Sequence, residues 1–63
     1  MKAILHTGGS AFRVEGEEHA QVIKRWESAL RSDDPIFPIK VRIHVGLTTM
    51  HILTSTIIRI EQE

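Results

Sequence analysis

The sequence predicts a small α+β domain of the ββαββ type, an antiparallel sheet with one helix packed on one face. Three observations predict it: a glycine pair between two alternating runs, one segment of helical period, and a long alternating run followed by a turn. We interpret residues 1–63 as a single domain. It comprises a hairpin over 1–16, a helix over 17–31, a loop over 32–38 and strands over 39–61.

The first hairpin is predicted from Gly8 and Gly9, because a glycine pair readily adopts the positive φ angles of a two-residue turn. The turn also sets the register of the two strands. It pairs Thr7 with Ser10, Leu5 with Phe12, Ala3 with Val14 and Lys2 with Glu15. Apolar residues then share one face, and opposite charges meet on the other, which favours this register.

The helix is predicted from apolar residues spaced by about 3.6, which are Ala20, Val22, Ile23, Trp26, Ala29 and Leu30. Trp26 lies at the centre of this apolar stripe, so we expect it to be the main core residue of the helix. The alternative is an exposed aromatic that stacks on a base or a sugar. Pro35 and Pro38 predict that the chain leaves the helix in an extended connection.

The segment from Ile39 to Val45 alternates apolar and basic residues, the period of a half-buried strand. Its apolar residues are expected to face the core, and Lys40, Arg42 and His44 to face the other way. The residues 46–49 are predicted to form a turn, after which Met50 and Ile52 face inward and His51 and Leu53 outward.

Two registers remain open for this second hairpin. Val45 pairs with Met50 in one and with Thr48 in the other, and the first would place His44 opposite His51. Both keep the same residues on the core face, because they differ by two positions.

The adjacent pair Ile57 and Ile58 breaks the alternation near the end of the chain. We therefore expect a bulge or a short turn over 54–56. A further strand over 57–61 is the predicted continuation, and a single helical turn capped by Ser55 or Thr56 is the alternative.

Composition excludes several classes of function. Eight basic and eight acidic residues give no net charge, so no global field attracts nucleic acid or an anionic membrane. The lack of cysteine excludes disulfides, thiolate zinc sites and a cysteine nucleophile. No apolar run approaches the roughly 20 residues that cross a bilayer. The apolar stretch at the start of the chain is too short for a secretory signal and is followed too soon by polar residues, so we expect a cytoplasmic protein.

One side of the predicted sheet has no helix to cover it. Its candidate partner-binding or nucleic-acid-binding residues are Lys2, Arg13, Lys40, Arg42, His44, His51 and Leu53. We expect this face to be locally cationic, because Glu15 is the one acidic residue assigned to it. The plain alternative is a solvated face, since antiparallel sheets commonly expose one side to water.

These features predict a non-enzymatic interaction module that forms homo-oligomers through the sheet face or its edges, since so short a chain buries a small core. A protein-binding variant is a small phage-type inhibitor or adaptor. The alternative function is weak nucleic-acid binding by the basic face, which offers no aromatic side chain for stacking.

His6, His44 and His51 would hold a metal if they converged, but no compact ligand motif supports this. We therefore predict no catalytic residue, metal or cofactor.

Overall fold

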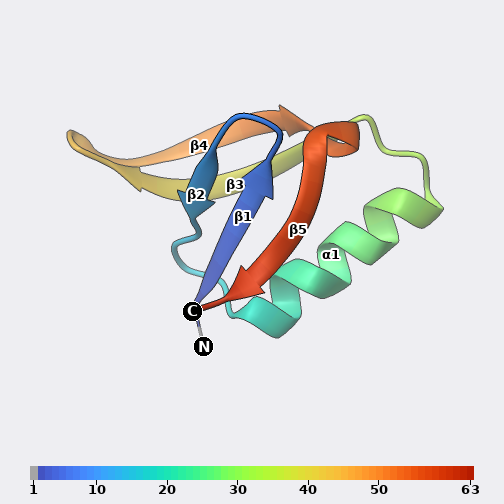
Figure 1. The fold of residues 1–63 in the computed structure, drawn as a ribbon, viewed down its shortest axis with the longest axis horizontal. Coiled ribbons are helices and arrows are strands. Elements are labelled where there is room, and N and C mark those ends of the chain that lie inside the picture. The colour runs from blue at the N-terminus through green and yellow to red at the C-terminus, as the bar shows by residue number, and fades with distance from the viewer. Residues whose placement is uncertain (1) are drawn as a thin grey trace.

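The computed structural model describes residues 2–63 and confirms a small α+β fold with antiparallel strands and a single α-helix in that range (Figure 1). The elements are β1 (Ala3–Thr7), β2 (Ala11–Arg13), α1 (His19–Arg31), β3 (Ile36–Ile43), β4 (Gly46–Leu53), the short 3₁₀ helix η1 (Thr54–Thr56) and β5 (Ile57–Gln62). No helix in residues 2–63 has the length and apolar character needed to cross a bilayer.

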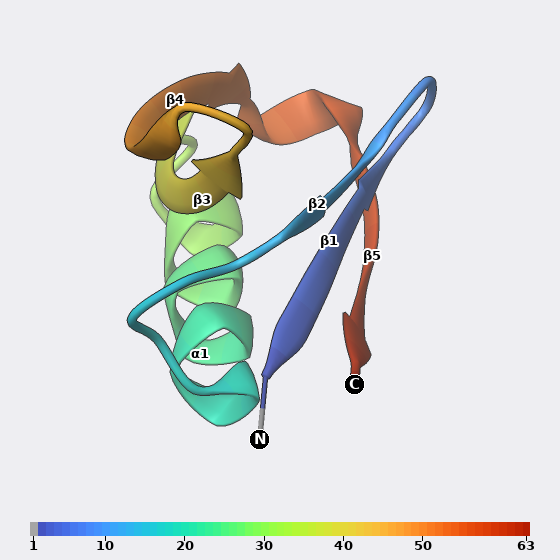
Figure 2. The ribbon, with the colours of Figure 1, turned by 90° about the vertical axis from the view of Figure 1, so that its left-hand side faces the viewer.

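The strands lie in two sheets, with the orders β2-β1-β5 and β3-β4. The chain just after β2 joins the two sheets: Val14 forms a bridge with Val41, and the N–H of Glu15 donates to the Lys40 carbonyl at 2.8 Å. Helix α1 runs beneath the β3–β4 hairpin, with the other sheet beside it (Figure 2). The uncovered surface is therefore divided between two sheets that meet at a corner.

The first hairpin has the predicted register, with Leu5 opposite Phe12. The N–H of Thr7 donates to the Ser10 carbonyl at 2.8 Å, and that of Val14 donates to the Ala3 carbonyl at 2.9 Å. Met1, which belongs to the predicted hairpin, lies outside the described residues. The alternation and the glycine turn together were sufficient to predict this unit.

Helix α1 begins at His19, two residues later than predicted. Glu18 is the N-cap residue and forms a capping box with Gln21, whose side-chain oxygen accepts the Glu18 N–H at 2.9 Å. The capping box places Glu17 before the helix. There, the Glu17 carboxylate accepts two hydrogen bonds from Arg25, at 2.7 and 2.8 Å.

The core is formed by ten buried apolar residues: Ala3, Leu5, Val14, Val22, Ala29, Phe37, Ile39, Val41, Ile57 and Ile60. The expectation for the helix is partly wrong. Val22 and Ala29 are its buried residues, Trp26 is half-buried against the core, and Leu30 is 54% exposed. The largest fully buried side chain belongs to Phe37, which strand β3 supplies.

Strand β3 begins at Ile36, which corrects the predicted loop over 32–38 and the predicted strand start at residue 39. Pro38 fits within the strand because of the direction in which its backbone nitrogen points. The Lys40 carbonyl faces Glu15, away from β4, and backbone groups two residues apart point the same way. The N–H that Pro38 lacks would therefore also point away from β4, so no β3–β4 hydrogen bond is lost.

The turn of the second hairpin lies at His44 and Val45, and not over the predicted residues 46–49. Gly46 has a φ of 128° and opens β4 opposite Ile43. Only glycine adopts this angle readily, so the chain reverses immediately before it. Val45 therefore pairs with neither Met50 nor Thr48, and both predicted registers are wrong.

The same register places His51 opposite Pro38, so the predicted pairing of His44 with His51 is also wrong. The observed register differs from the predicted ones by an even number of positions. The inward phase is therefore preserved, and Met50 and Ile52 pack partly buried against the core as predicted.

The end of the chain forms the predicted short turn, η1, followed by the predicted strand, β5. Thr7 lies opposite Ile57 and His6 opposite Arg59, so the pairing of β1 with β5 skips Ile58. This irregularity lets Ile57 and Ile60, which are three residues apart, both be buried, while Ile58 is 62% exposed.

Candidate interaction edge

The seven predicted binding residues lie in two groups rather than on one continuous face. Lys2 and Arg13 belong to the β1–β2 hairpin, and Arg42 comes close to them at the corner between the sheets, where all three line a shallow depression with Glu15. The remaining predicted residues lie on the β3–β4 hairpin, and these are Lys40, His44, His51 and Leu53.

Carboxylates hold the basic residues at the corner. Glu15 lies 3.3 Å from Nε of Arg42 and 4.0 Å from Nζ of Lys2. Glu63 lies 2.7 Å from Nη2 of Arg13. The cationic excess expected from the sequence is therefore largely neutralised at this corner.

Strand β5 also brings Glu61 beside β1, where its Oε1 lies 2.7 Å from Nε2 of His6. The hydrogen bond with His6 is the main cause that lowers the pKa of Glu61; burial opposes it, and the charges of Arg59 and His6 lower the pKa further. The sequence pattern missed Glu61 and Glu63 because the pairing of β5 with β1 is a long-range contact.

The three histidines of the metal hypothesis do not converge. His6 lies in β1, His44 in the hairpin turn and His51 on β4, in the other sheet. Residues 2–63 contain no group of three or more metal-binding side chains.

The outer edge of β4 is the feature that sets this surface apart. Strand β4 is hydrogen-bonded to β3 on one side and has no strand on the other side within the described chain. Its eight residues, Gly-Leu-Thr-Thr-Met-His-Ile-Leu, include no Lys, Arg, Asp, Glu or Pro. Natural proteins usually protect exposed edges with such residues, with bulges or with very short strands.

The other strands carry these protections. Strand β2 is three residues long, and β3 contains Pro38. Strand β5 contains Arg59 and Glu61 and an irregularity in its pairing with β1. Its Ile60 carbonyl also accepts a hydrogen bond from Nε2–H of His19 at 3.2 Å. Among the described strands, β4 is thus the long edge without protection.

The backbone groups available on this edge follow from the register. Lys40 directs its carbonyl to Glu15, away from β4, and Thr49 lies opposite Lys40. In an antiparallel ladder, the N–H and C=O of Thr49 must then point away from β3, towards the free edge. The same holds at every second residue, so the edge presents the N–H and C=O of Leu47, Thr49 and His51. Leu53 presents its N–H there, while its carbonyl accepts the Thr56 hydroxyl.

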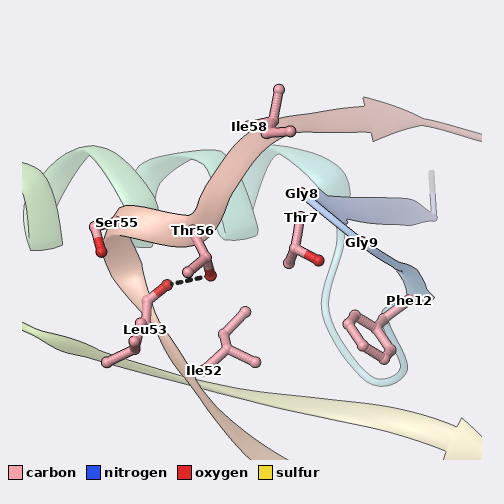
Figure 3. A pocket seen from close by; sticks show the side chains of 9 residues that line it. All are labelled: Thr7, Gly8, Gly9, Phe12, Ile52, Leu53, Ser55, Thr56 and Ile58. Atoms are coloured by element: carbon pink, nitrogen blue, oxygen red, sulfur yellow. Dashed lines mark hydrogen bonds between the residues drawn. The ribbon is translucent and has the colours of Figure 1, made fainter.

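An apolar groove lies at the C-terminal end of β4, between the tip of the β1–β2 hairpin and η1 (Figure 3). It has a volume of about 600 Å³, and Phe12, Ile52, Leu53 and Ile58 supply its apolar lining. The hydroxyl of Thr56 donates to the Leu53 carbonyl at 2.7 Å and fixes the turn beside the groove.

The opposite end of β4 is also apolar. The tip of the β3–β4 hairpin protrudes from the body of the protein (Figure 1) and carries Val45, 76% exposed, and Leu47, 54% exposed. Exposed apolar side chains therefore stand at both ends of the unprotected edge.

No protein-family model, curated protein or solved structure matches this chain.

Proposed function

We propose that this protein is a small, non-enzymatic interaction module that self-associates by adding a strand to the free edge of β4. The observation that carries the proposal is the eight-residue edge of β4, which contains no Lys, Arg, Asp, Glu or Pro and has no partner strand within residues 2–63. Strand addition gives affinity through main-chain hydrogen bonds, and side chains next to the edge give specificity.

The size of the protein supports the same proposal. A chain of 63 residues buries a small apolar core, and association is one of the means by which such chains gain stability. The exposed apolar residues Val45, Leu47, Leu53 and Ile58 flank the edge, where a second strand would cover them.

Nucleic-acid binding is the weaker alternative. Glu15 and Glu63 already hold Arg42 and Arg13, so a phosphate would have to displace these carboxylates. Lys40 remains on the outer face of β3, and the exposed faces of β3 and β4 carry no Phe, Tyr or Trp for base stacking. Salt-sensitive binding that the double substitution K40E/R42E abolishes would support this alternative.

The experiment for self-association compares the wild type with Thr49→Pro and Thr49→Val by sedimentation velocity over a range of concentrations. Because the Thr49 N–H points to the free edge, proline blocks strand addition without removing a β3–β4 hydrogen bond. We expect the wild type and Thr49→Val to form dimers or larger species, and Thr49→Pro to remain monomeric with an unchanged far-UV circular dichroism spectrum. A wild type that stays monomeric at the highest soluble concentration would contradict the proposal.

A further inference from the structure

The free edge of β4 is complementary to a second copy of the same strand. We infer that two chains pair antiparallel along β4 about a two-fold axis through Met50, so that β3 and β4 of both copies form one continuous sheet. This inference rests on the proposed function and adds the identity, direction and register of the partner strand.

Symmetry limits the registers. A two-fold axis that relates adjacent antiparallel strands is perpendicular to the sheet, so the core faces of both copies lie on the same side. Directly opposite residues of an antiparallel pair also point to the same face. An outward-facing residue must therefore meet an outward-facing residue, which requires the axis to pass through a residue and not between two neighbours.

An axis through Met50 places every residue of β4 whose backbone groups point to the free edge opposite another such residue. It places Leu47 of one copy opposite Leu53 of the other, and Thr49 opposite His51. These are the residues whose backbone groups point to the free edge. At each Thr49–His51 pair both residues offer an N–H and a carbonyl, whereas at each Leu47–Leu53 pair the Leu53 carbonyl already accepts the Thr56 hydroxyl and the Leu53 N–H is its free group. On the outer face, leucine meets leucine and threonine meets histidine.

Neighbouring registers are poorer. An axis through Thr49 would place Leu53 opposite Val45, which lies in the hairpin turn and not in β4. An axis through His51 would extend the pairing past the end of β4 into η1. Centring on Met50 keeps all the outward-directed backbone groups within the strand.

The same register brings the apolar hairpin tip of one copy to the apolar groove of the other. With Leu47 opposite Leu53 of the second copy, Val45 continues past Leu53 towards Ser55. Ser55 lies at the groove that Ile52 and Ile58 also line (Figure 3). The dimer therefore covers apolar surface at both ends of the edge as well as the backbone groups between them.

Single cysteines test the register, because the wild-type chain contains none. Residue 50 would face its own copy across the axis as a non-hydrogen-bonded pair, in which Cα atoms lie about 4.5 Å apart, within the range of a disulfide. In a glutathione redox buffer, we expect Met50→Cys to form a covalent dimer at least about tenfold faster than Thr49→Cys or His51→Cys, because only its thiols meet on the axis.

A second measurement uses exposed positions, in case Met50→Cys disturbs the core. Leu47→Cys and Leu53→Cys, mixed in equal amounts, should form a mixed covalent dimer, and neither variant alone should do so at a comparable rate. A faster cross-link at Thr49→Cys or His51→Cys would overturn the register.

Failure of this inference is distinguishable from failure of the proposed function. If the wild type associates and Thr49→Pro abolishes association, but neither the residue 50 cross-link nor the mixed 47–53 cross-link forms, the register is wrong and edge-mediated association stands. If the wild type is monomeric, both the association and the symmetric dimer are wrong, and a strand from a different protein becomes the partner to seek.

Discussion

Asp33 is the one non-glycine residue within 2–63 that has a positive φ, at 56°. It follows the C-cap of α1, where the N–H of Asp34 donates to the Ala29 carbonyl at 3.0 Å and that of Asp33 to the Leu30 carbonyl at 3.4 Å. This is the Schellman arrangement, in which glycine is the usual residue because it has no Cβ to strain the left-handed conformation. Asp33 is therefore a position at the end of α1 where glycine would relieve backbone strain.

We predict that Asp33→Gly raises the free energy of unfolding by about 0.5–1 kcal/mol, because strain relief exceeds the entropy that glycine adds to the unfolded chain. Urea unfolding followed by circular dichroism measures the change. Asp34→Gly is the matched control, because Asp34 has no positive φ and should gain nothing. Equal or lower stability of Asp33→Gly relative to this control would contradict the assignment.

Glu61 provides a second prediction at the residue scale. The hydrogen bond with His6 lowers the pKa of the Glu61 carboxyl, so this carboxylate stabilises the fold above its unfolded pKa. The contribution is lost as the pH falls through the lowered pKa. We expect His6→Ala to raise the pKa of Glu61 towards its ordinary value in a ¹³C carboxyl NMR titration. His51→Ala, in the other sheet, should leave it unchanged; a change there and none in His6→Ala would refute the proposed cause.

At the scale of elements, strand β3 alternates buried and exposed residues, and its inner face holds the core together. Phe37 is 1% exposed, and its ring lies under the Arg25 guanidinium, whose Cζ is 4.4 Å from the ring centroid. Ile36, its neighbour, faces outward and is exposed. Phe37 and Ile36 are thus neighbours in the same strand, and one is buried while the other is exposed.

We predict that Phe37→Ala lowers the free energy of unfolding by about 3–5 kcal/mol, enough to unfold much of so small a protein. Ile36→Ala should cost less than about 1 kcal/mol, because its side chain is partly in water already. Thermal and urea unfolding of both variants give the comparison. A larger loss in Ile36→Ala would contradict the assignment of the inner face of β3.

At the scale of the whole molecule, association along β4 would couple stability to protein concentration. We predict that the melting temperature of the wild type rises by about 3–5 °C for each tenfold increase in concentration, because only the folded chain offers the paired edge. Thr49→Lys should remove this dependence, since a charged residue protects an exposed edge. Differential scanning calorimetry measures both proteins, and a concentration-independent wild type would argue against association.

Features that depend on neighbours along the chain could be predicted from the sequence. The Gly8-Gly9 turn and the alternation around it were enough for the register of the first hairpin. The helical period located α1 to within two residues, and the break at Ile57 and Ile58 located the last strand. The inward phase of Met50 and Ile52 also survived a wrong register, because a shift by an even number of residues preserves the face.

Features that depend on which distant segments meet could not be predicted from these local patterns. The largest fully buried side chain is that of Phe37 and not that of Trp26, the strands lie in two sheets, Glu63 lies beside Arg13 of the expected cationic face, and Glu61 lies beside His6. The tertiary structure also left β4 as the unprotected edge of the described sheet. The physical reason is that the period of the apolar pattern indicates on which side of a strand each residue lies. Long-range packing and hydrogen bonding select which strands become neighbours.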